Sequence, residues 1–311
     1  MVIPESFVKN IGRLFVWFPL RWSIGSLAPG KDISLIRFLA RVYYFYGKAK
    51  VAQVTKNLST VYDLLEAPLT LKQIVVLNFE THFLNQYLVF LFQKLRKTNI
   101  HKYHSFEGWT NLECALQRGK GCIIVHAHFG PAQLPLLHLG IENQPIMQIG
   151  YHHEGSGLSG VGKIVQRKKI KMEMCAPVSF VMADTFLRPV FRHLNDNGIL
   201  MLTGDGVGGD RYIGRYAPVS FFGRKVLFSA GPASLALRSG AMLLPAFTIP
   251  AGDTGYTTVF EKPLNGCLDM NRDKYIRMKA QEFSMTMEKY VKRYPFHWHL
   301  WDEFEKGRYI K

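Results

Sequence analysis

A histidine that could act as a base stands at the end of an apolar run. The segment from 121 to 130 reads GCIIVHAHFG, and a proline follows at position 131. Pro131 suits the first position of a helix, so we expect His128 in a loop between a buried strand and a helix N-terminus. Free N–H groups at such a terminus can face a reactant. A neutral imidazole there can take the proton from an alcohol that attacks an acyl carbonyl.

Two other interpretations of this histidine stay open. A single histidine beside an apolar run can be a hydrogen-bonded core residue. His126 and His128 could also bind a metal from one face of a strand, but the sequence places no further ligand beside them. The pairs 152–153 and 297–299 do not have the spacing of a metalloenzyme. We therefore expect no metal site.

A second segment supplies a carboxylate after another apolar run. Residues 198–211 read GILMLTGDGVGGDR, and glycines after a strand can bring backbone amides to a pyrophosphate. That interpretation needs a helix directly after the glycines, whereas RYIGRYAP follows from position 211. A dinucleotide site is therefore disfavoured. What remains is a loop with the carboxylate of Asp205 and with Arg211 and Arg215 nearby.

The pattern of the chain predicts an α/β fold. Short apolar runs alternate with helical stretches from Gly119 onward, which is typical of a sheet with crossover helices. We expect strands over 122–126, 145–151, 199–203, 242–249 and 256–261. We expect helices over 110–117, 131–139, 186–195, 229–238 and 272–294. Ligand sites in such sheets gather where strands end, which points to 126–133 and 203–211.

Residues 1–100 form a helical region in this interpretation, and residues 101–311 form the α/β domain. Apolar periodicity predicts helices over 33–46, 48–65 and 71–95. No run reaches the roughly 18 to 20 apolar residues that span a bilayer. The segment Leu14–Pro29 combines tryptophans with arginines, which favours contact with a membrane interface. The alternative is an amphipathic helix that packs on the protein's own core.

The charge of the chain favours anionic partners. It has 39 Lys and Arg against 23 Asp and Glu, a formal charge of +16. Nucleic acid, phospholipid headgroups and an acidic carrier protein all fit this charge. We expect no nucleic acid, because no recognition module is present. Four cysteines without CxxC spacing suit a reducing compartment, and the N-terminus lacks the layout of a cleavable signal.

Several segments together resemble the late acyltransferases of lipid A biosynthesis. This lysophospholipid-acyltransferase-like family includes the phosphatidylinositol mannoside acyltransferases of glycolipid biosynthesis. The blocks occur in family order and cover most of the chain: HSFEGW from 104, GKG from 119, AHFG from 127, TGD from 203, FFGR from 221, AMLLP from 241 and YPFHWHLW from 294. Each block is weak alone, and the ordered set is fairly specific.

The resemblance implies a glycerolipid-acyltransferase-like mixed sheet flanked by helices, with an N-terminal helical membrane-interacting region. It implies acyl transfer from acyl carrier protein or acyl-CoA to a hydroxyl of a glycolipid or lysophospholipid. Beyond this co-substrate it implies no cofactor. The expected location is the cytoplasmic face of the bacterial inner membrane, as a peripheral or monotopic protein on an anionic surface.

By the resemblance His128 is the general base, but the family's acid falls on Gln133. A carboxylate orients the imidazole and stabilises its cation, whereas an amide brings no charge. Three outcomes stay open. Gln133 suffices, another carboxylate such as Asp205 or Glu154 replaces it, or the protein is a catalytically impaired lipid-binding or assembly protein.

The resemblance also implies residues that bind the substrate. Asp205 and Arg224 match family positions near its polar end, Arg211 lies in the same loop as Asp205, and Arg167 matches a family arginine. Phe221 and Phe222, which precede Gly223, are expected to border the acyl groove. The predicted substrate-binding residues are Arg167, Arg211, Phe221, Phe222, Gly223 and Arg224.

Overall fold

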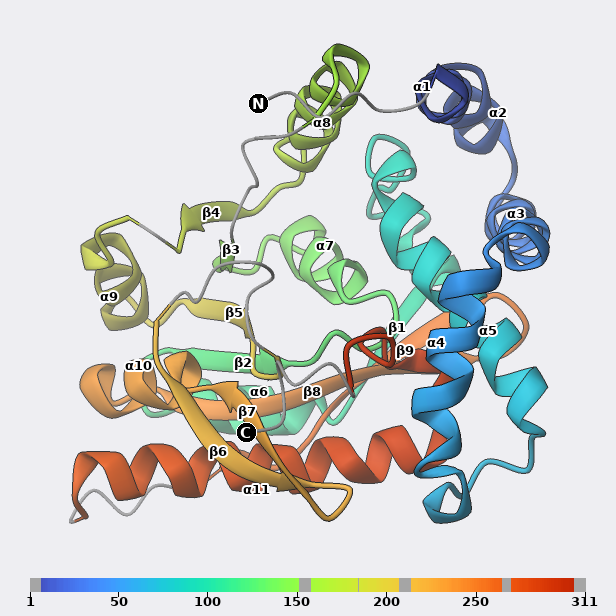
Figure 1. Cartoon of the computed structure of the whole chain (residues 1–311). Helices are drawn as coiled ribbons and strands as arrows, with labels where there is room; N and C mark the ends of the chain where they lie inside the picture. Colours follow the sequence, from blue (N-terminus) through green and yellow to red (C-terminus); the bar gives the residue numbers. More distant parts are fainter. Residues whose placement is uncertain (1–6, 151–157, 184, 207–213, 265–269, 305–311) are drawn as a thin grey trace.

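The computed structural model describes residues 7–150, 158–183, 185–206, 214–264 and 270–304. Within these residues one sheet has the strand order β1-β9-β8-β2-β5-β3-β4, and β6 and β7 form a separate antiparallel hairpin (Figure 1). The strands are β1 His104–Glu107, β2 Cys122–His126, β3 Ile146–Gly150, β4 Ser179–Met182, β5 Ile199–Thr203, β6 Tyr216–Phe221, β7 Arg224–Ser229, β8 Met242–Ala251 and β9 Gly255–Phe260.

Helices cover both faces of this sheet. The α-helices are α1 Phe7–Phe15, α2 Arg21–Ser26, α3 Lys31–Tyr46, α4 Lys48–Ser59, α5 Leu71–Tyr87, α6 Trp109–Leu116, α7 Gln133–Ile141, α8 Gly160–Glu173, α9 Arg188–Asn195, α10 Gly231–Ser239 and α11 Arg272–Arg293. The π-helix η1 Val16–Leu20 joins α1 to α2. Short 3₁₀ turns are η2 Tyr62–Leu64, η3 Leu88–Phe90, η4 Ile100–Lys102 and η5 Pro295–His297.

The central strand β2 is apolar throughout because both of its faces are covered. Ile123 and Val125 pack in the cluster that contains residues of α10 and α11. Cys122 and Ile124 pack in the cluster that contains residues of α6 and α7. Such two-sided burial is expected of parallel strands between helical layers, and β2 pairs in parallel with both β5 and β8.

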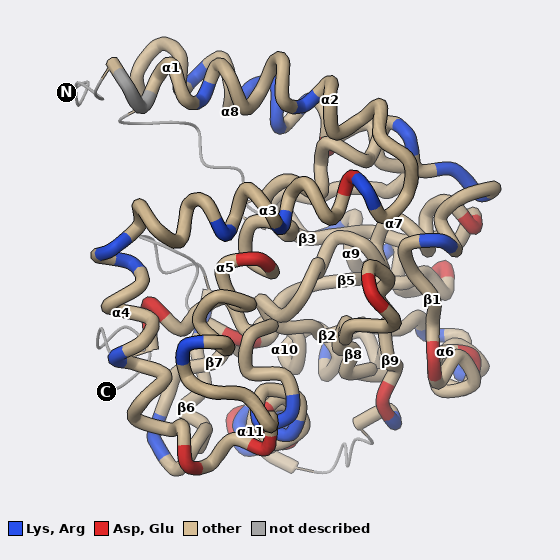
Figure 2. The backbone as a smooth tube through the Cα atoms, turned by 90° about the vertical axis from the view of Figure 1, so that its right-hand side faces the viewer, with Lys and Arg blue, Asp and Glu red and all other residues tan. Residues whose placement is uncertain are grey.

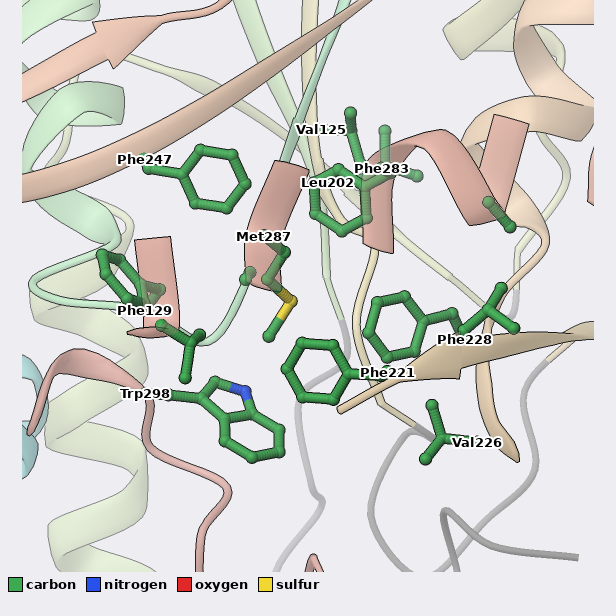
Figure 3. Packing of buried hydrophobic residues seen from close by; sticks show 14 of the residues in the cluster. Val125, Phe129, Leu202, Phe221, Val226, Phe228, Phe247, Phe283, Met287 and Trp298 are labelled. Atoms are coloured by element: carbon green, nitrogen blue, oxygen red, sulfur yellow. The ribbon is translucent and has the colours of Figure 1, made fainter. Parts of the chain in front are cut away.

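An aromatic core fills the space between the sheet, α11 and the β6–β7 hairpin. Figure 3 shows the ring of Phe221 and the side chain of Met287 beside the indole of Trp298. The ring centroids of Phe221 and Trp298 lie 5.3 Å apart, in an edge-to-face arrangement. This packing fixes the indole and therefore anything that hydrogen-bonds to it.

The N-terminal helices share a core with the α/β part. Trp17, Ile33 and Leu88 pack in one cluster with Leu134 of α7 and Tyr256 of β9. In the described residues, every helix is too short or too polar to cross a membrane. Contact of this region with a membrane stays a prediction. A domain boundary at residue 100 also stays a prediction.

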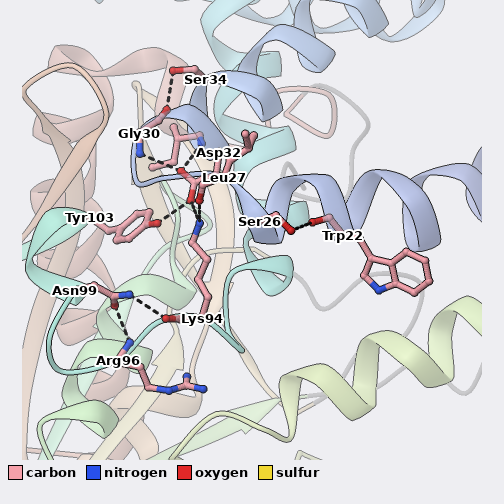
Figure 4. Close-up of polar contacts among 11 residues, drawn as sticks. Trp22, Ser26, Leu27, Gly30, Asp32, Ser34, Lys94, Arg96, Asn99 and Tyr103 are labelled. Atoms are coloured by element: carbon pink, nitrogen blue, oxygen red, sulfur yellow. Dashed lines mark hydrogen bonds and ion pairs between the residues drawn. The ribbon is translucent and has the colours of Figure 1, made fainter.

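A buried carboxylate ties the start of α3 to the segment before β1. Asp32 accepts hydrogen bonds from the backbone N–H of Gly30 and Ile33 and from the hydroxyl of Tyr103, and it pairs with the ammonium group of Lys94 (Figure 4). Because the carboxylate is fully buried, these four partners replace the water that it loses on folding.

The structure confirms the α/β class and the mixed sheet flanked by helices. The predicted strands 122–126 and 199–203 match β2 and β5 at both ends. The predicted helix 48–65 is wrong at its end, because α4 stops at Ser59 and a 3₁₀ turn follows. Strands β1 and β4, the β6–β7 hairpin and helix α8 were not predicted.

Candidate active site

His128 lies in the loop that follows β2, and its backbone is held on both sides. Its N–H donates to Oδ1 of Asp205 at 2.9 Å, and its carbonyl accepts from the N–H of His299 at 2.8 Å. Two residues further on, Gly130 has a φ of 61°, and a Cβ there would lie 2.5 Å from the carbonyl oxygen of Thr248. A side chain at position 130 would therefore push the loop away from β8.

Strand register brings His128 and Asp205 together. β2 and β5 run parallel, and His126 is paired with Thr203. His128 and Asp205 each follow two residues after that pair. The Nδ1–H of His128 donates to Oδ1 of Asp205 at 2.9 Å. Two loops at the same edge of the sheet thus deliver a histidine–aspartate pair.

Trp298 completes the environment of the carboxylate. Its indole Nε1–H donates to Oδ2 of Asp205 at 2.9 Å, and residue 298 also forms a β-bridge with Phe129. Asp205 is buried, whereas the side chain of His128 is 48% exposed. The ring of His128 has no other hydrogen bond within the described residues. Its Nε2 is therefore available to a reactant.

The pair is electrostatically coupled. Desolvation is the largest influence on His128 and lowers its pKa, but the charge of Asp205 and the hydrogen bond to it outweigh this, so the pKa lies above its ordinary value. Burial raises the pKa of Asp205, but the charge of His128 and the hydrogen bonds from His128 and Trp298 bring it below its ordinary value. The carboxylate therefore stabilises the protonated ring, as a base needs when it has taken a proton.

Neighbouring histidines do not share this property. Burial lowers the pKa of His126 to about 4 and the pKa values of His297 and His299 to about 3. The rings of His297 and His299 donate to the backbone carbonyls of Thr248 and Gly130. These neutral rings hold the loop in place, and of these four histidines only His128 combines exposure with a carboxylate partner.

Gln133 lies outside the histidine–aspartate pair. It is the first residue of α7, and in the described part of the chain it forms no hydrogen bond with His128. It lines a hollow of about 260 Å³ together with His82, Asn85 and Lys169. The buried amide oxygen of Asn85 has no hydrogen-bond partner in the described residues. The polar hollow that Gln133 lines thus contains an acceptor without a partner among the described residues.

A larger, mainly apolar cavity lies among the N-terminal helices. Its volume is about 810 Å³. Its lining comes mostly from aliphatic and aromatic side chains, among them Val16, Trp17, Leu20, Leu39, Phe79, Phe83 and Phe90. A cavity of this size and lining suits a hydrocarbon chain.

His82 connects this cavity to the loop of His128. It lines both the apolar cavity and the polar hollow that contains Gln133. Its ring centroid lies 5.6 Å from that of His299, whose backbone N–H holds the carbonyl of His128. The apolar cavity, the polar hollow and the histidine–aspartate pair are therefore neighbours in space.

The sequence profile described as bacterial lipid A biosynthesis acyltransferase matches residues 10–303. The chain belongs to this family. A comparison with curated proteins found no match. The family match confirms the resemblance drawn from the ordered blocks, and it extends over the N-terminal helices as well as the sheet.

The two phenylalanines that were predicted to border an acyl groove lie in the core. Phe221 and Phe222 are buried and pack against Trp301 and Phe304, and they are not among the residues that line the apolar cavity. Phe222 and Gly223 have φ values of 51° and 69°, as the two-residue turn of a β-hairpin requires. Their visible role is to close the hairpin whose core supports Trp298.

The predicted arginines are spread over several elements. Arg224 lies over the ring of Phe304, with its guanidinium carbon 5.1 Å from the ring centroid. Arg167 is exposed on α8, the helix that also contributes Lys169 to the polar hollow. Arg211 and Glu154 lie outside the described residues. Substrate binding by these residues stays a prediction.

Proposed function

We propose that this chain transfers a fatty acyl group from a thioester to a lipid hydroxyl, with His128 as the general base. The observation that carries the proposal is the hydrogen bond between His128 Nδ1 and Asp205 Oδ1, with Trp298 on the other carboxylate oxygen. Membership in an acyltransferase family supports the reaction type. The expected donor is acyl carrier protein or acyl-CoA, and the expected acceptor is a glycolipid or lysophospholipid.

The pair can carry the proton through both halves of the reaction. Nε2 of His128 takes the proton of the acceptor hydroxyl as its oxygen attacks the thioester carbonyl. Asp205 holds the ring in the required tautomer and stabilises the imidazolium. When the tetrahedral intermediate collapses, the carbon–sulfur bond breaks and His128 returns the proton to the thiolate. An ester and a free thiol result, and the histidine is restored.

Asp205 supplies the charge that Gln133 lacks, which favours an active enzyme over a catalytically impaired lipid-binding protein. Purified protein given acyl carrier thioester and a bacterial lipid extract is expected to release free thiol. The variant His128→Ala is expected to abolish this release while its circular dichroism stays unchanged. Lipid binding without any thiol release by the wild-type protein would instead support the impaired alternative.

We further propose that the N-terminal helices rest on the cytoplasmic face of the inner membrane. Figure 2 shows lysines and arginines along this part of the molecule, where α1 packs against α8. Exposed aromatic rings lie on α1, α2 and the end of α3, among them Phe7, Phe15, Trp22, Phe45 and Tyr46. Rings that enter the headgroup region and cations that meet phosphate give such a surface affinity for an anionic bilayer. Replacing Trp22 by serine should weaken binding to anionic vesicles, whereas the same change at exposed Met285 on α11 should not.

A further inference from the structure

A second group of histidines lies where α7 ends and β1 begins. His101, His138 and Glu142 each offer one potential ligand atom, and these three atoms lie within 4.8 Å of one another. His138 and Glu142 are four residues apart at the end of α7, so they face the same side. Nε2 of His101, on η4, lies 3.8 Å from Oε1 of Glu142. Two separate elements thus bring two imidazoles and a carboxylate to one point.

A buried partner fixes the orientation of the His138 ring. Nδ1 of His138 lies 2.9 Å from Nδ1 of His104, and Nε2 of His104 lies 2.7 Å from the hydroxyl oxygen of Thr258. His104, His138 and Thr258 are all buried. When the Nδ1–H of His138 donates to His104, Nε2 of His138 carries the lone pair that a metal ligand needs. Histidines that bind metals commonly use their other ring nitrogen in such a hydrogen bond.

Zinc binding requires the three ligand atoms to move closer together than the 4.8 Å within which they lie here. Zinc bonds of about 2.0 to 2.2 Å place tetrahedral ligand atoms roughly 3.3 Å apart. The separation between His101 and Glu142 is 3.8 Å, and the His101 side chain is 64% exposed, so a small rotation closes the gap. Lys97 now holds Oε2 of Glu142 at 2.9 Å, but its own side chain is 67% exposed and can withdraw.

We propose that His101, His138 and Glu142 bind one zinc ion, with water in the fourth position. Two histidines, a glutamate and water form an established set of zinc ligands. The bound ion would connect η4 to the end of α7, the helix that begins with Gln133 beside the active site. Its direct effect is to stabilise the junction of these elements.

The test is isothermal titration of zinc chloride into metal-free protein purified without a histidine tag. We expect about one ion per chain and a zinc-dependent rise in Tm. His101→Ala removes an exposed ligand without disturbing the core and should weaken binding by about tenfold or more. Glu142→Gln should act in the same direction, and the exposed Glu113→Gln on α6 is its control.

A substitution at Lys97 should strengthen zinc binding, whereas the substitutions above weaken it. Lys97→Gln removes the cation that competes for Glu142 and should tighten zinc binding several-fold. Lys102→Gln changes the net charge equally on the neighbouring turn η4 and should leave the affinity unchanged. Absence of zinc binding, or an affinity that His101→Ala and Glu142→Gln leave unaltered, would overturn the proposal. Because the readout is zinc affinity, the result is independent of the proposed acyl transfer.

Discussion

Oδ1 of Asp205 lies 2.9 Å from Nδ1 of His128, although 77 residues separate them in the chain. Both residues follow strands that are paired in register, and the carboxylate is buried while the ring is half-exposed. A buried carboxylate that orients an accessible imidazole is the arrangement that general-base catalysis of acyl transfer uses. On this geometry we propose that Asp205 takes the role of the missing motif carboxylate.

Trp298 is expected to act as a positioning residue. The variant Trp298→Phe leaves Oδ2 of Asp205 buried without its donor, so the carboxylate can rotate away from His128. We expect kcat to fall by about tenfold, roughly 1.4 kcal/mol, with little change in KM. Trp301→Phe is the matched control, because that buried indole donates to the carbonyl of Pro295 instead. An equal loss of kcat in both variants would mean that Trp298 matters only for packing.

Gln133 is expected to tolerate a carboxylate. Since Asp205 already supplies the charge next to His128, Gln133→Glu should keep kcat within about threefold of the wild-type value. Steady-state thiol release measures this directly. A sharp loss would show that the catalytic site depends on the amide at position 133.

The pH dependence should reveal the coupling between the two residues. His128 acts as a base only when it is neutral, and Asp205 raises its pKa. The kcat/KM of the wild-type protein should therefore rise with pH through an apparent pKa above about 6.5. In Asp205→Asn the stabilising charge is lost while desolvation remains, so the pKa of His128 should fall. The rise of kcat/KM with pH should therefore occur at lower pH. A rise that stays in place would show that another group titrates there.

The Asp32 cluster is expected to stabilise the docking of the N-terminal helices. Asp32→Ala leaves Lys94 without its buried partner and removes the acceptor of Tyr103. Breaking a buried ion pair costs about 3–5 kcal/mol, so the free energy of unfolding in urea should fall by that order. Asp63→Ala, at an exposed position on η2, should change it by less than about 0.5 kcal/mol. Equal effects would contradict the assigned role.

Much of the sheet could be predicted because local patterns determine it. The uninterrupted apolar residues of β2 and β5 follow from burial on both faces, and their ends were predicted correctly. The β6–β7 hairpin was missed because its turn is formed by Phe222 and Gly223, and a phenylalanine at positive φ is not a usual turn signal. Helix α8 was missed because five lysine and arginine residues and two glycines interrupt its apolar residues over 14 positions.

The sequence alone could not decide which side chain hydrogen-bonds to the ring of His128. Family spacing pointed to Gln133, and Asp205 was one of two carboxylates considered as a replacement. The deciding fact is the register of β2 and β5, a long-range pairing that local patterns do not contain. Trp298 and the His101, His138 and Glu142 group were missed for the same reason, although the four-residue spacing of His138 and Glu142 was a usable signal.

The most direct test of the account compares kcat/KM for thiol release in Asp205→Asn and Gln133→Ala. Both variants remove a candidate partner of His128, and asparagine preserves the shape of the aspartate. We expect a loss of about 10² to 10⁴-fold for Asp205→Asn, by analogy with the amide substitution in a catalytic triad, and a change below about tenfold for Gln133→Ala. A large loss in Gln133→Ala with near-normal turnover in Asp205→Asn would show that Gln133, and not Asp205, supports His128.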